Sequence, residues 1–494
     1  MLTKNGSSKF ILTLGIACAF LYVVYLQFLS PAFCDPDSYY HIAASNFIKN
    51  YGLHYPFRWT QFSTFKDSFS DKDILFHILN LPFLFLTDNL VLAGKYAFVF
   101  HAGLFFLVYV FILKKYLPDF LAAVFLLLPF SSSAFTAYFL QLRSATLANI
   151  FLILGIYFLI NKRLTGLFII SLLYPLAHVS FFMIIVFAFV CEILRWLIKK
   201  EFFAKNICIA IAGVISGCLI HPDFPRNLFS LYLNGVLVPL YGLRGADLGF
   251  GSELQAFDTK LTLIGNFAVF LSLNVILWVA LLTKRVVSLA TAVWLASAGI
   301  YLFLAFFGNR YWYQANALFF IFFASCLNDW RGDKNRAKPM QRFKFPAALY
   351  FIISLVFLAP NLKQLKGFME FSCARSLHFE NAGRWMNKNI PANQTIYHSY
   401  WTDAPYFICL NPKDNYINAL DPIYMFYRYP REFNLLNELS LGRVDKPDEA
   451  IGRIFKARYG YLNKFEPLYR QINDAPRYFK ILYEDSEGII FKLR

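Results

Sequence analysis

Long apolar runs recur along the chain from residue 10 to residue 360, and they restrict the fold more than any other feature. Of the 494 residues, 58% are hydrophobic and 16% are charged, whereas a soluble domain carries about 25% charged residues. Phe alone occurs 58 times, which is more than a water-soluble interior of this size can hide. This composition excludes an ordinary soluble enzyme, a disordered chain and a disulfide scaffold. It predicts an α-helical polytopic membrane protein.

A membrane-crossing helix needs about 20 mainly apolar residues, and on this basis the sequence predicts about eleven spans. The predicted spans are 10–30, 89–113, 120–138, 143–160, 164–177, 179–197, 206–220, 261–283, 286–307, 311–327 and 343–360. Ile74–Leu86 is apolar but too short to cross, which favours a re-entrant or interfacial helix. Residues 1–360 are therefore expected to form the membrane domain, with a first outer loop at 31–73 and a long outer loop at 221–260.

The charges beside these spans predict their orientation. With the N-terminus in the cytoplasm, the inner ends of the spans hold 18 Lys and Arg residues and the outer loops before residue 361 hold 10, as the positive-inside rule requires. The net charge of +17 therefore reflects topology. It does not indicate nucleic-acid binding, because no outward basic stripe with interleaved aromatic residues occurs. An odd number of spans places residues 361–494 on the extracytoplasmic side, and a bacterial inner membrane is the expected location.

Residues 361–494 contain no spanning run, and about a quarter of them are charged, as in soluble domains. Helical patterns alternate there with short β-like runs, which predicts a soluble extracytoplasmic α/β domain. The helices are expected at Phe379–Asn389 and Pro447–Ala457, and the strands at Thr395–Tyr400, Tyr459–Asn463, Phe479–Tyr483 and Gly488–Leu493. Cys34, Cys373 and Cys409 are expected to face outward, but their spacing shows no disulfide framework.

Two carboxylates, Asp35 and Asp37, follow the first predicted span. In one interpretation, Asp37 or Ser38 caps an interfacial helix, which needs only one acid. In the other, a carboxylate deprotonates an acceptor hydroxyl, or the pair holds Mg²⁺ or Mn²⁺ through oxygen ligands. The catalytic hypothesis assigns Asp35 and Asp37 to catalysis or metal binding, and the nearby His41 to acceptor binding.

Four basic residues are predicted at the outer ends of later spans: Arg143, His178, His221 and Arg310. Alone, an interfacial Arg extends to lipid headgroups, and a His is most often a satisfied buried polar group. Together, on the same side as Asp35, they suit an anionic phosphate attached to a lipid, because Arg binds phosphate in bidentate fashion and His can donate or shuttle a proton.

The loop from His221 to Lys260 is long and rich in glycine. It is either a flexible surface loop or a mobile lid over a bound lipid. Glu253 or Asp258 within it could complete a metal site. In the C-terminal domain, Trp401 and Asp403 follow a β-like run, and we expect them to contact an acceptor or to pack on the membrane face.

These motifs resemble the C-type glycosyltransferase (GT-C) superfamily, which takes a sugar from a lipid-linked phosphate. The run Asp35–His41 (DPDSYYH) is similar to the acidic motif of oligosaccharyltransferase catalytic subunits, and Asp35–Pro82 is similar to bacterial relatives of unassigned substrate. Arg310-Tyr311 resembles their Arg-Phe element, in which an arginine meets the donor phosphate. Trp401-Thr402-Asp403 loosely resembles their acceptor motif.

The resemblance implies a membrane glycosyltransferase that moves a sugar from a polyprenyl-phosphate donor to a glycan, lipid or protein acceptor. It implies that Asp35, or alternatively Asp37, is the catalytic carboxylate. Two alternatives stay open: a transporter or flippase of a lipid-linked or anionic solute, and a non-catalytic subunit of an envelope polymer assembly. Related halves and polar residues at mid-membrane would favour transport, but the sequence shows neither.

Overall fold

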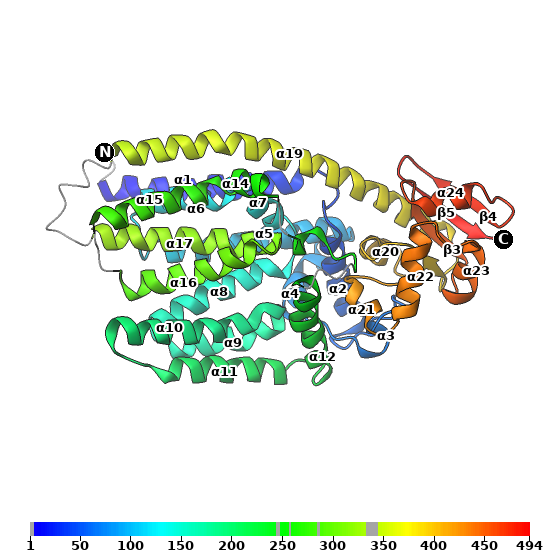
Figure 1. The fold of residues 1–494 in the computed structure, drawn as a ribbon, viewed down its shortest axis with the longest axis horizontal. Coiled ribbons are helices and arrows are strands. Elements are labelled where there is room, and N and C mark those ends of the chain that lie inside the picture. Colours follow the sequence, from blue (N-terminus) through cyan, green and yellow to red (C-terminus); the bar gives the residue numbers. More distant parts are fainter. Residues whose placement is uncertain (1–3, 244–247, 256–257, 284–286, 332–343) are drawn as a thin grey trace.

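A computed structural model of the chain describes residues 4–243, 248–255, 258–283, 287–331 and 344–494. Most of its helices lie side by side in one bundle, and a smaller α/β unit lies at one end of that bundle (Figure 1). The helices before the α/β unit are α1 (Lys4–Phe28), α2 (Pro36–Tyr51), α3 (Phe65–Ser68), α4 (Ile74–Asn80), η1 (Leu81–Phe85), α5 (Leu90–Leu113), α6 (Asp119–Leu127), η2 (Leu128–Ser131), α7 (Ser133–Phe139), α8 (Ser144–Ile160), α9 (Leu164–Ala177), η3 (Val179–Phe182), α10 (Met183–Lys199), α11 (Ala204–Leu219), α12 (Arg226–Tyr232), η4 (Leu233–Leu237), α13 (Val238–Leu243), η5 (Ser252–Leu254), α14 (Thr259–Gly265), α15 (Phe267–Thr283), α16 (Leu289–Ala305), η6 (Asn309–Tyr311), α17 (Trp312–Arg331) and α19 (Lys344–Asn389).

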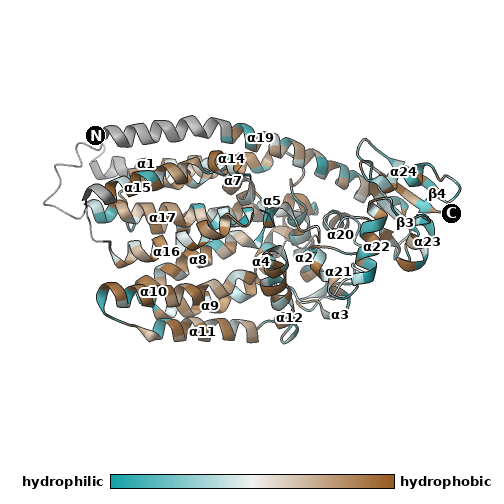
Figure 2. Cartoon of the chain, in the orientation of Figure 1, coloured by the Kyte–Doolittle hydropathy of each residue, from teal (hydrophilic) through white to brown (hydrophobic). Residues whose placement is uncertain are grey.

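The bundle is apolar along most of its length, whereas the α/β unit mixes polar and apolar residues (Figure 2). Within the described residues, three helices are long and apolar enough to cross a membrane: Lys9–Phe28, Leu90–Leu113 and Val179–Lys199. Two bent helix pairs would raise that number to 5 if each pair forms one span. A helix lies at each of the eleven predicted spans, but several, such as α9, are shorter than about 20 residues. The number of eleven spans therefore stays a prediction.

Two of the predicted spans are broken helices. The span predicted at 120–138 bends by 90° between Asp119–Ser131 and Ser133–Phe139, and the one predicted at 261–283 bends by 75° after Gly265. Pro129 lies at the first break, where it cannot continue the helical hydrogen bonding. The two breaks contact each other, because the Ser132 hydroxyl donates a 2.8 Å hydrogen bond to Asn266 Oδ1. As a result, α7 turns away from the direction of α6.

Helix α19 joins the bundle to the α/β unit without interruption. It runs along the edge of the bundle and continues into the α/β unit (Figure 1). The predicted domain boundary at residue 361 therefore falls inside one continuous helix, and the helix expected at Phe379–Asn389 is the last part of it.

The C-terminal unit contains a mixed five-stranded sheet in the order β2-β1-β3-β5-β4. Strand β1 pairs in parallel with β2 and β3, whereas β5 pairs antiparallel with β3 and β4. Its elements are β1 (Thr395–Tyr397), α20 (Ala404–Leu410), β2 (Asn415–Tyr416), α21 (Pro422–Phe426), α22 (Pro430–Ser440), α23 (Pro447–Glu449), η8 (Ala450–Ile454), β3 (Tyr459–Asn463), α24 (Pro467–Asn473), β4 (Phe479–Glu484) and β5 (Gly488–Leu493). The four expected strands are confirmed. The two-residue strand β2 and the helices α20, α21, α22 and α24 were not predicted, and most of them are too short to show a clear period.

The first outer loop docks on this sheet. The Gln61 and Phe62 amides donate hydrogen bonds to the carbonyls of Tyr416 and Ile417, each 2.8 Å long. The Trp59 indole donates to the Pro412 carbonyl at 2.7 Å. The loop therefore extends the β2 edge of the sheet, and the α/β unit is fixed against the end of the bundle that carries this loop.

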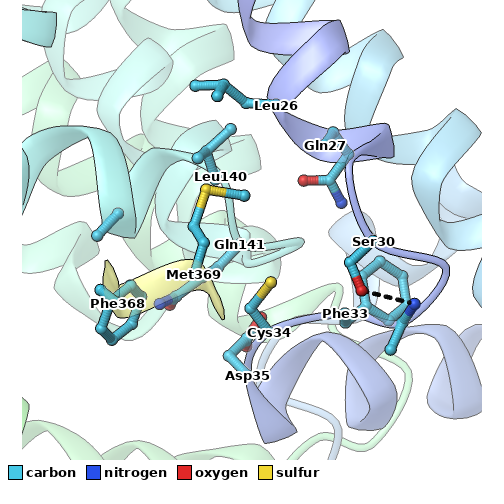
Figure 3. A pocket seen from close by; sticks show the side chains of 12 residues that line it. Leu26, Gln27, Ser30, Phe33, Cys34, Asp35, Leu140, Gln141, Phe368 and Met369 are labelled. Atoms are coloured by element: carbon cyan, nitrogen blue, oxygen red, sulfur yellow. Dashed lines mark hydrogen bonds between the residues drawn. The ribbon is translucent and has the colours of Figure 1, made fainter. Parts of the chain in front are cut away.

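A disulfide between Cys34 and Cys373 adds a covalent link between the first outer loop and α19. The spacing of cysteines in the sequence does not reveal this pairing, because 339 residues separate the two. Figure 3 shows Cys34 and Asp35 beside Phe368 and Met369 of α19. The outward cysteines were expected to form no disulfide framework. The structure corrects this expectation for one pair.

Candidate active site

Asp35 is the N-cap of α2, a role that the sequence interpretation had given to Asp37 or Ser38. Its side chain accepts hydrogen bonds from the Ser38 amide at 3.0 Å and from the Ser38 hydroxyl at 2.5 Å. Pro36 at the first helical position needs no amide partner. The Ser38 hydroxyl also accepts the Leu142 amide at 2.9 Å, which ties the start of α2 to the segment before α8. Asp35 is thus engaged at both oxygens.

Asp37 is oriented differently, because it lies in the first turn of α2 and not at its cap. Its side chain is 28% exposed, compared with 7% for Asp35. Arg143 Nη2 lies 2.8 Å from Asp37 Oδ2. Burial raises the pKa of Asp37 to about 6, although the positive charge of Arg143 works in the opposite direction. Burial also raises the pKa of Asp35 above its ordinary value.

Arg143 connects these acids to the long outer loop. Its Nη1 lies 2.5 Å from Glu253 Oε2, and its Nε lies 3.7 Å from Asp35 Oδ1. The Tyr138 ring packs against the guanidinium at 4.9 Å, and its hydroxyl accepts a 3.2 Å hydrogen bond from Nη1. Arg143 was expected to bind a donor phosphate, but its guanidinium faces three carboxylates.

Arg310 lies on the other side of Glu253. It belongs to η6, which follows α16, and its Nη1 lies 4.0 Å from Glu253 Oε1. The Asn309 amide donates to the Gln255 carbonyl at 3.1 Å, which fixes this turn to the long outer loop. Burial tends to raise the pKa of Glu253, but Arg143 and Arg310 outweigh it and bring that pKa below its ordinary value. Among the described residues, Arg310 makes one long ion pair, and it is 28% exposed, so its guanidinium has capacity for an anion.

These groups face one cavity of about 660 Å³ between the first outer loop, the long outer loop, α19 and the α/β unit. The residues that line it include Cys34, Asp35, Pro36, Asp37, Ser133, Ala134, Ala137, Tyr138, Gln141, Arg143, Gly251, Glu253, Leu254, Asn309, Arg310, Gln364, Leu365, Phe368, Phe371, Ser372, Arg375, Phe379, Trp401, Thr402, Asp403, Tyr406, Leu420 and Asp421. Six predicted site residues thus meet there: Asp35, Asp37, Arg143, Arg310, Trp401 and Asp403.

The α/β unit contributes the wall of the cavity that carries Trp401 and Asp403, which are predicted to contact the acceptor. The Trp401 indole donates a 3.0 Å hydrogen bond to the Gly249 carbonyl in the long outer loop. Asp403 is 1% exposed, and its Oδ1 has no hydrogen-bond partner among the described residues. Burial and the nearby Glu466 raise the pKa of Asp403 well above its ordinary value.

The apolar wall comes from α19. Leu365 is buried, whereas Phe368 and Phe371 are 43% and 72% exposed although they line the cavity. Exposed aromatic side chains beside charged groups suit a ligand with a long hydrocarbon part and a polar head.

His178 and His221 do not line the cavity. Nδ1 of His178 bonds with Ser180 at the start of η3, at 2.8 Å to the hydroxyl. Nε2 of His221 lies 3.0 Å from the Asp71 carbonyl, and its Nδ1 accepts the Asp223 amide. These contacts cap turns and join loops. Neither imidazole lines the cavity in which the donor phosphate is expected to bind.

His41 also lies outside the lining residues. Its Nδ1 is 2.7 Å from Nε2 of His77, and Nδ1 of His77 is 2.6 Å from Asp71 Oδ2. All three side chains are buried. The His41 ring therefore anchors α2 to α4 and is not available to the cavity as an acceptor contact.

Arg375 and Asp421 line the cavity but were not proposed as site residues. Arg375 lies midway along α19, where no local motif marks it, and its guanidinium lies 5.8 Å from the Phe379 ring. Asp421 caps α21 by accepting the Ile423 amide at 2.9 Å. Burial raises the pKa of Asp421 to about 7.

No family model matches the sequence, and no curated protein sequence matches it. Solved structures do match the fold. The archaeal oligosaccharyltransferase AglB from Archaeoglobus fulgidus, in complex with an inhibitory peptide and a dolichol-phosphate, matches with a TM-score of 0.63 at 10% identity. That match covers 92% of this chain and 69% of AglB.

ArnT from Cupriavidus metallidurans is similar over nearly its whole length. In the apo state it matches with a TM-score of 0.59 at 10% identity, covering 98% of each chain. Bound to undecaprenyl phosphate, it matches with a TM-score of 0.54 at 10% identity, covering 96% of this chain and 97% of ArnT. Identity at this level shows a shared fold. The predicted resemblance to the GT-C superfamily is confirmed at the level of the fold.

Proposed function

We propose that the chain is a membrane glycosyltransferase that transfers a sugar from a polyprenyl-phosphate donor to an acceptor at the extracytoplasmic face. One observation carries the proposal: a single cavity is lined by carboxylates that include Asp35 and Asp37, by arginines and by the exposed aromatic residues of α19. The same fold occurs in a structure with bound undecaprenyl phosphate and in one with bound dolichol-phosphate and peptide.

The donor is proposed to place its phosphate at Arg310 and its hydrocarbon chain along Phe368 and Phe371. Arg310 keeps its charge at any working pH and can give two parallel hydrogen bonds to phosphate. In the transition state, negative charge develops on the departing phosphate oxygen, and a fixed guanidinium there stabilises it by several kcal/mol at most. Arg375 is positioned on the same cavity and is a second candidate contact.

Asp37 is proposed as the base, because Asp35 is used as the helix cap. Asp37 takes the proton of an acceptor hydroxyl while that oxygen bonds to the anomeric carbon of the sugar. The bond from the anomeric carbon to the phosphate oxygen breaks, and its electron pair leaves with the polyprenyl phosphate. Direct displacement inverts the anomeric configuration. A pKa of about 6 leaves Asp37 mainly ionised at neutral pH, as a base must be.

Trp401 and Asp403 are proposed to contact the acceptor from the α/β unit. The acceptor class is a glycan, a lipid or a protein hydroxyl or amide. The proposed location is a bacterial inner membrane with the N-terminus in the cytoplasm and the α/β unit outside.

The test uses membranes that contain the full chain and a panel of undecaprenyl-phosphate-linked radiolabelled sugars. Supporting results are release of undecaprenyl phosphate, transfer of label out of the lipid fraction, and strong loss of transfer in Arg310→Met. The matched control is Arg453→Met, an exposed arginine in the α/β unit outside the cavity. Label that crosses the membrane while still attached to lipid would reject the enzyme and support the flippase alternative.

A further inference from the structure

Three carboxylates face one guanidinium at the floor of the cavity. The nitrogens of Arg143 lie 2.8 Å from Asp37, 2.5 Å from Glu253 and 3.7 Å from Asp35. The acids come from the first outer loop and from the long outer loop, so only the fold brings them together. A cluster of this kind needs positive charge, because like charges in a buried site repel strongly.

Oxygen ligands from Asp and Glu are what Mg²⁺ and Mn²⁺ prefer, and the sequence offered Asp35 and Asp37 as ligands. The residues present do not fit such a site. Asp37 and Glu253 each direct an oxygen at a separate nitrogen of Arg143, and both oxygens of Asp35 accept hydrogen bonds from Ser38. Across the described ranges, no group of three or more His, Cys, Asp or Glu side chains is arranged to hold a metal ion.

We infer that Arg143 is a built-in cation that occupies the place a divalent metal ion would take between Asp37 and Glu253. The Arg143 side chain is 13% exposed and is held from behind by the Tyr138 ring and hydroxyl. Its backbone is held too, because the preceding Leu142 amide donates to the Ser38 hydroxyl. A guanidinium fixed on both sides supplies a permanent positive charge and directed hydrogen bonds.

The function of this cation is to neutralise and orient the two acids. Asp37 and Glu253 lie on different elements, and separate nitrogens of one planar group set the distance between them. The role of Arg143 in orienting acids for catalysis rests on the proposed function. The replacement of a metal ion concerns cation binding and can be tested without measuring sugar transfer.

The experiment measures Mn²⁺ bound to the purified full chain by electron paramagnetic resonance and equilibrium dialysis. The wild-type chain is expected to bind no stoichiometric Mn²⁺ at micromolar concentrations. Arg143→Met removes the internal cation but keeps an unbranched stem, so it is expected to gain one Mn²⁺ per chain and to unfold at a higher temperature when Mn²⁺ is added. Arg143→Gln serves as a second variant if the first does not fold.

Two controls isolate the site. Arg310→Met removes the neighbouring arginine but leaves Arg143 in place, so it should gain no Mn²⁺ site. The double variant Arg143→Met with Glu253→Gln should bind Mn²⁺ at least tenfold more weakly than Arg143→Met. The inference is overturned if the wild-type chain binds one Mn²⁺ that Asp37→Asn abolishes. It is also overturned if a folded Arg143 variant binds none.

Discussion

The disulfide between Cys34 and Cys373 fastens the residue before Asp35 to the helix that forms the apolar wall of the cavity. It connects the acid-bearing start of α2 with α19, which also runs into the α/β unit. The bond is compatible with an oxidising compartment, where structural disulfides persist. The covalent link therefore fixes the position of Asp35 and Asp37 relative to the apolar wall of the cavity.

Loss of this disulfide should destabilise the outer end of the bundle. Cys373→Ser is expected to lower the temperature of thermal unfolding, because a native disulfide contributes about 2–4 kcal/mol. Fluorescence-detected unfolding in detergent, with and without reductant, measures the effect. Cys18→Ser replaces an exposed free cysteine and should change nothing. Equal unfolding temperatures for wild type and Cys373→Ser would contradict the structural role.

Asn substitutions separate the roles of Asp35 and Asp37. Asn caps helices as well as Asp does, so Asp35→Asn should keep both stability and most of the transfer activity. Asp37→Asn should reduce transfer roughly 100- to 10,000-fold, since a positioned base contributes that much. The measurement is label transfer from the lipid-linked donor that the wild-type chain uses, with unfolding temperatures as a check. The reverse order of the two activities would assign the base to Asp35.

Asp421 should make stability depend on pH. Its carboxyl has a pKa of about 7 in the folded chain, against an ordinary value of 3.8, because burial opposes its charge. The folded chain therefore holds a proton that the unfolded chain releases. This contribution is complete below about pH 4 and is lost as the pH rises through 7.

Asp421→Asn should remove this loss, because Asn keeps the cap on the Ile423 amide but carries no charge. At pH 8 the variant should be more stable than wild type by about 1–3 kcal/mol and unfold at a higher temperature, and at pH 4 the gain should nearly disappear. Asp474→Asn, an exposed acid of the same unit, is the control. A gain of equal size at both pH values would disprove titration of Asp421 as the cause.

Phe371 and Phe85 provide a matched pair for the lipid-binding wall, since each side chain is 72% exposed. Phe371 lines the cavity, whereas Phe85 is absent from its lining. Phe371→Ser should weaken binding of undecaprenyl phosphate roughly tenfold, or about 1.4 kcal/mol. Phe85→Ser should leave it unchanged. Binding of tritiated undecaprenyl phosphate to the protein in detergent measures both, and equal affinities would place the lipid elsewhere.

Local sequence pattern predicted a mostly helical, apolar chain with a C-terminal α/β unit, and a helix lies at each predicted span, although the number of spans stays a prediction. Apolar runs such as Leu90–Leu113 can be recognised in the sequence, because a helix in lipid must form all its backbone hydrogen bonds internally and expose apolar side chains. The strands β3, β4 and β5 were likewise visible in runs of β-forming residues. The breaks at Pro129 and Asn266 were missed, since a bent span has the same composition as a straight one.

Site residues could be predicted only where they form a recognisable motif with their neighbours in the sequence. Asp35 and Asp37 stand out because two acids follow an apolar helix, and Arg310 because it lies between two spans. Their partners stood out less: Glu253 was expected only as one of two loop acids that could complete a metal site, and Arg375 lies in a segment with no distinguishing pattern. The histidines proposed for the phosphate lie outside the cavity lining. Contacts between residues hundreds of positions apart depend on how helices pack and bend, and the local periodicity of the sequence does not encode that packing. The sequence therefore determined a largely apolar helical bundle with acids after its first helix, and the tertiary structure decided which charges face one another there.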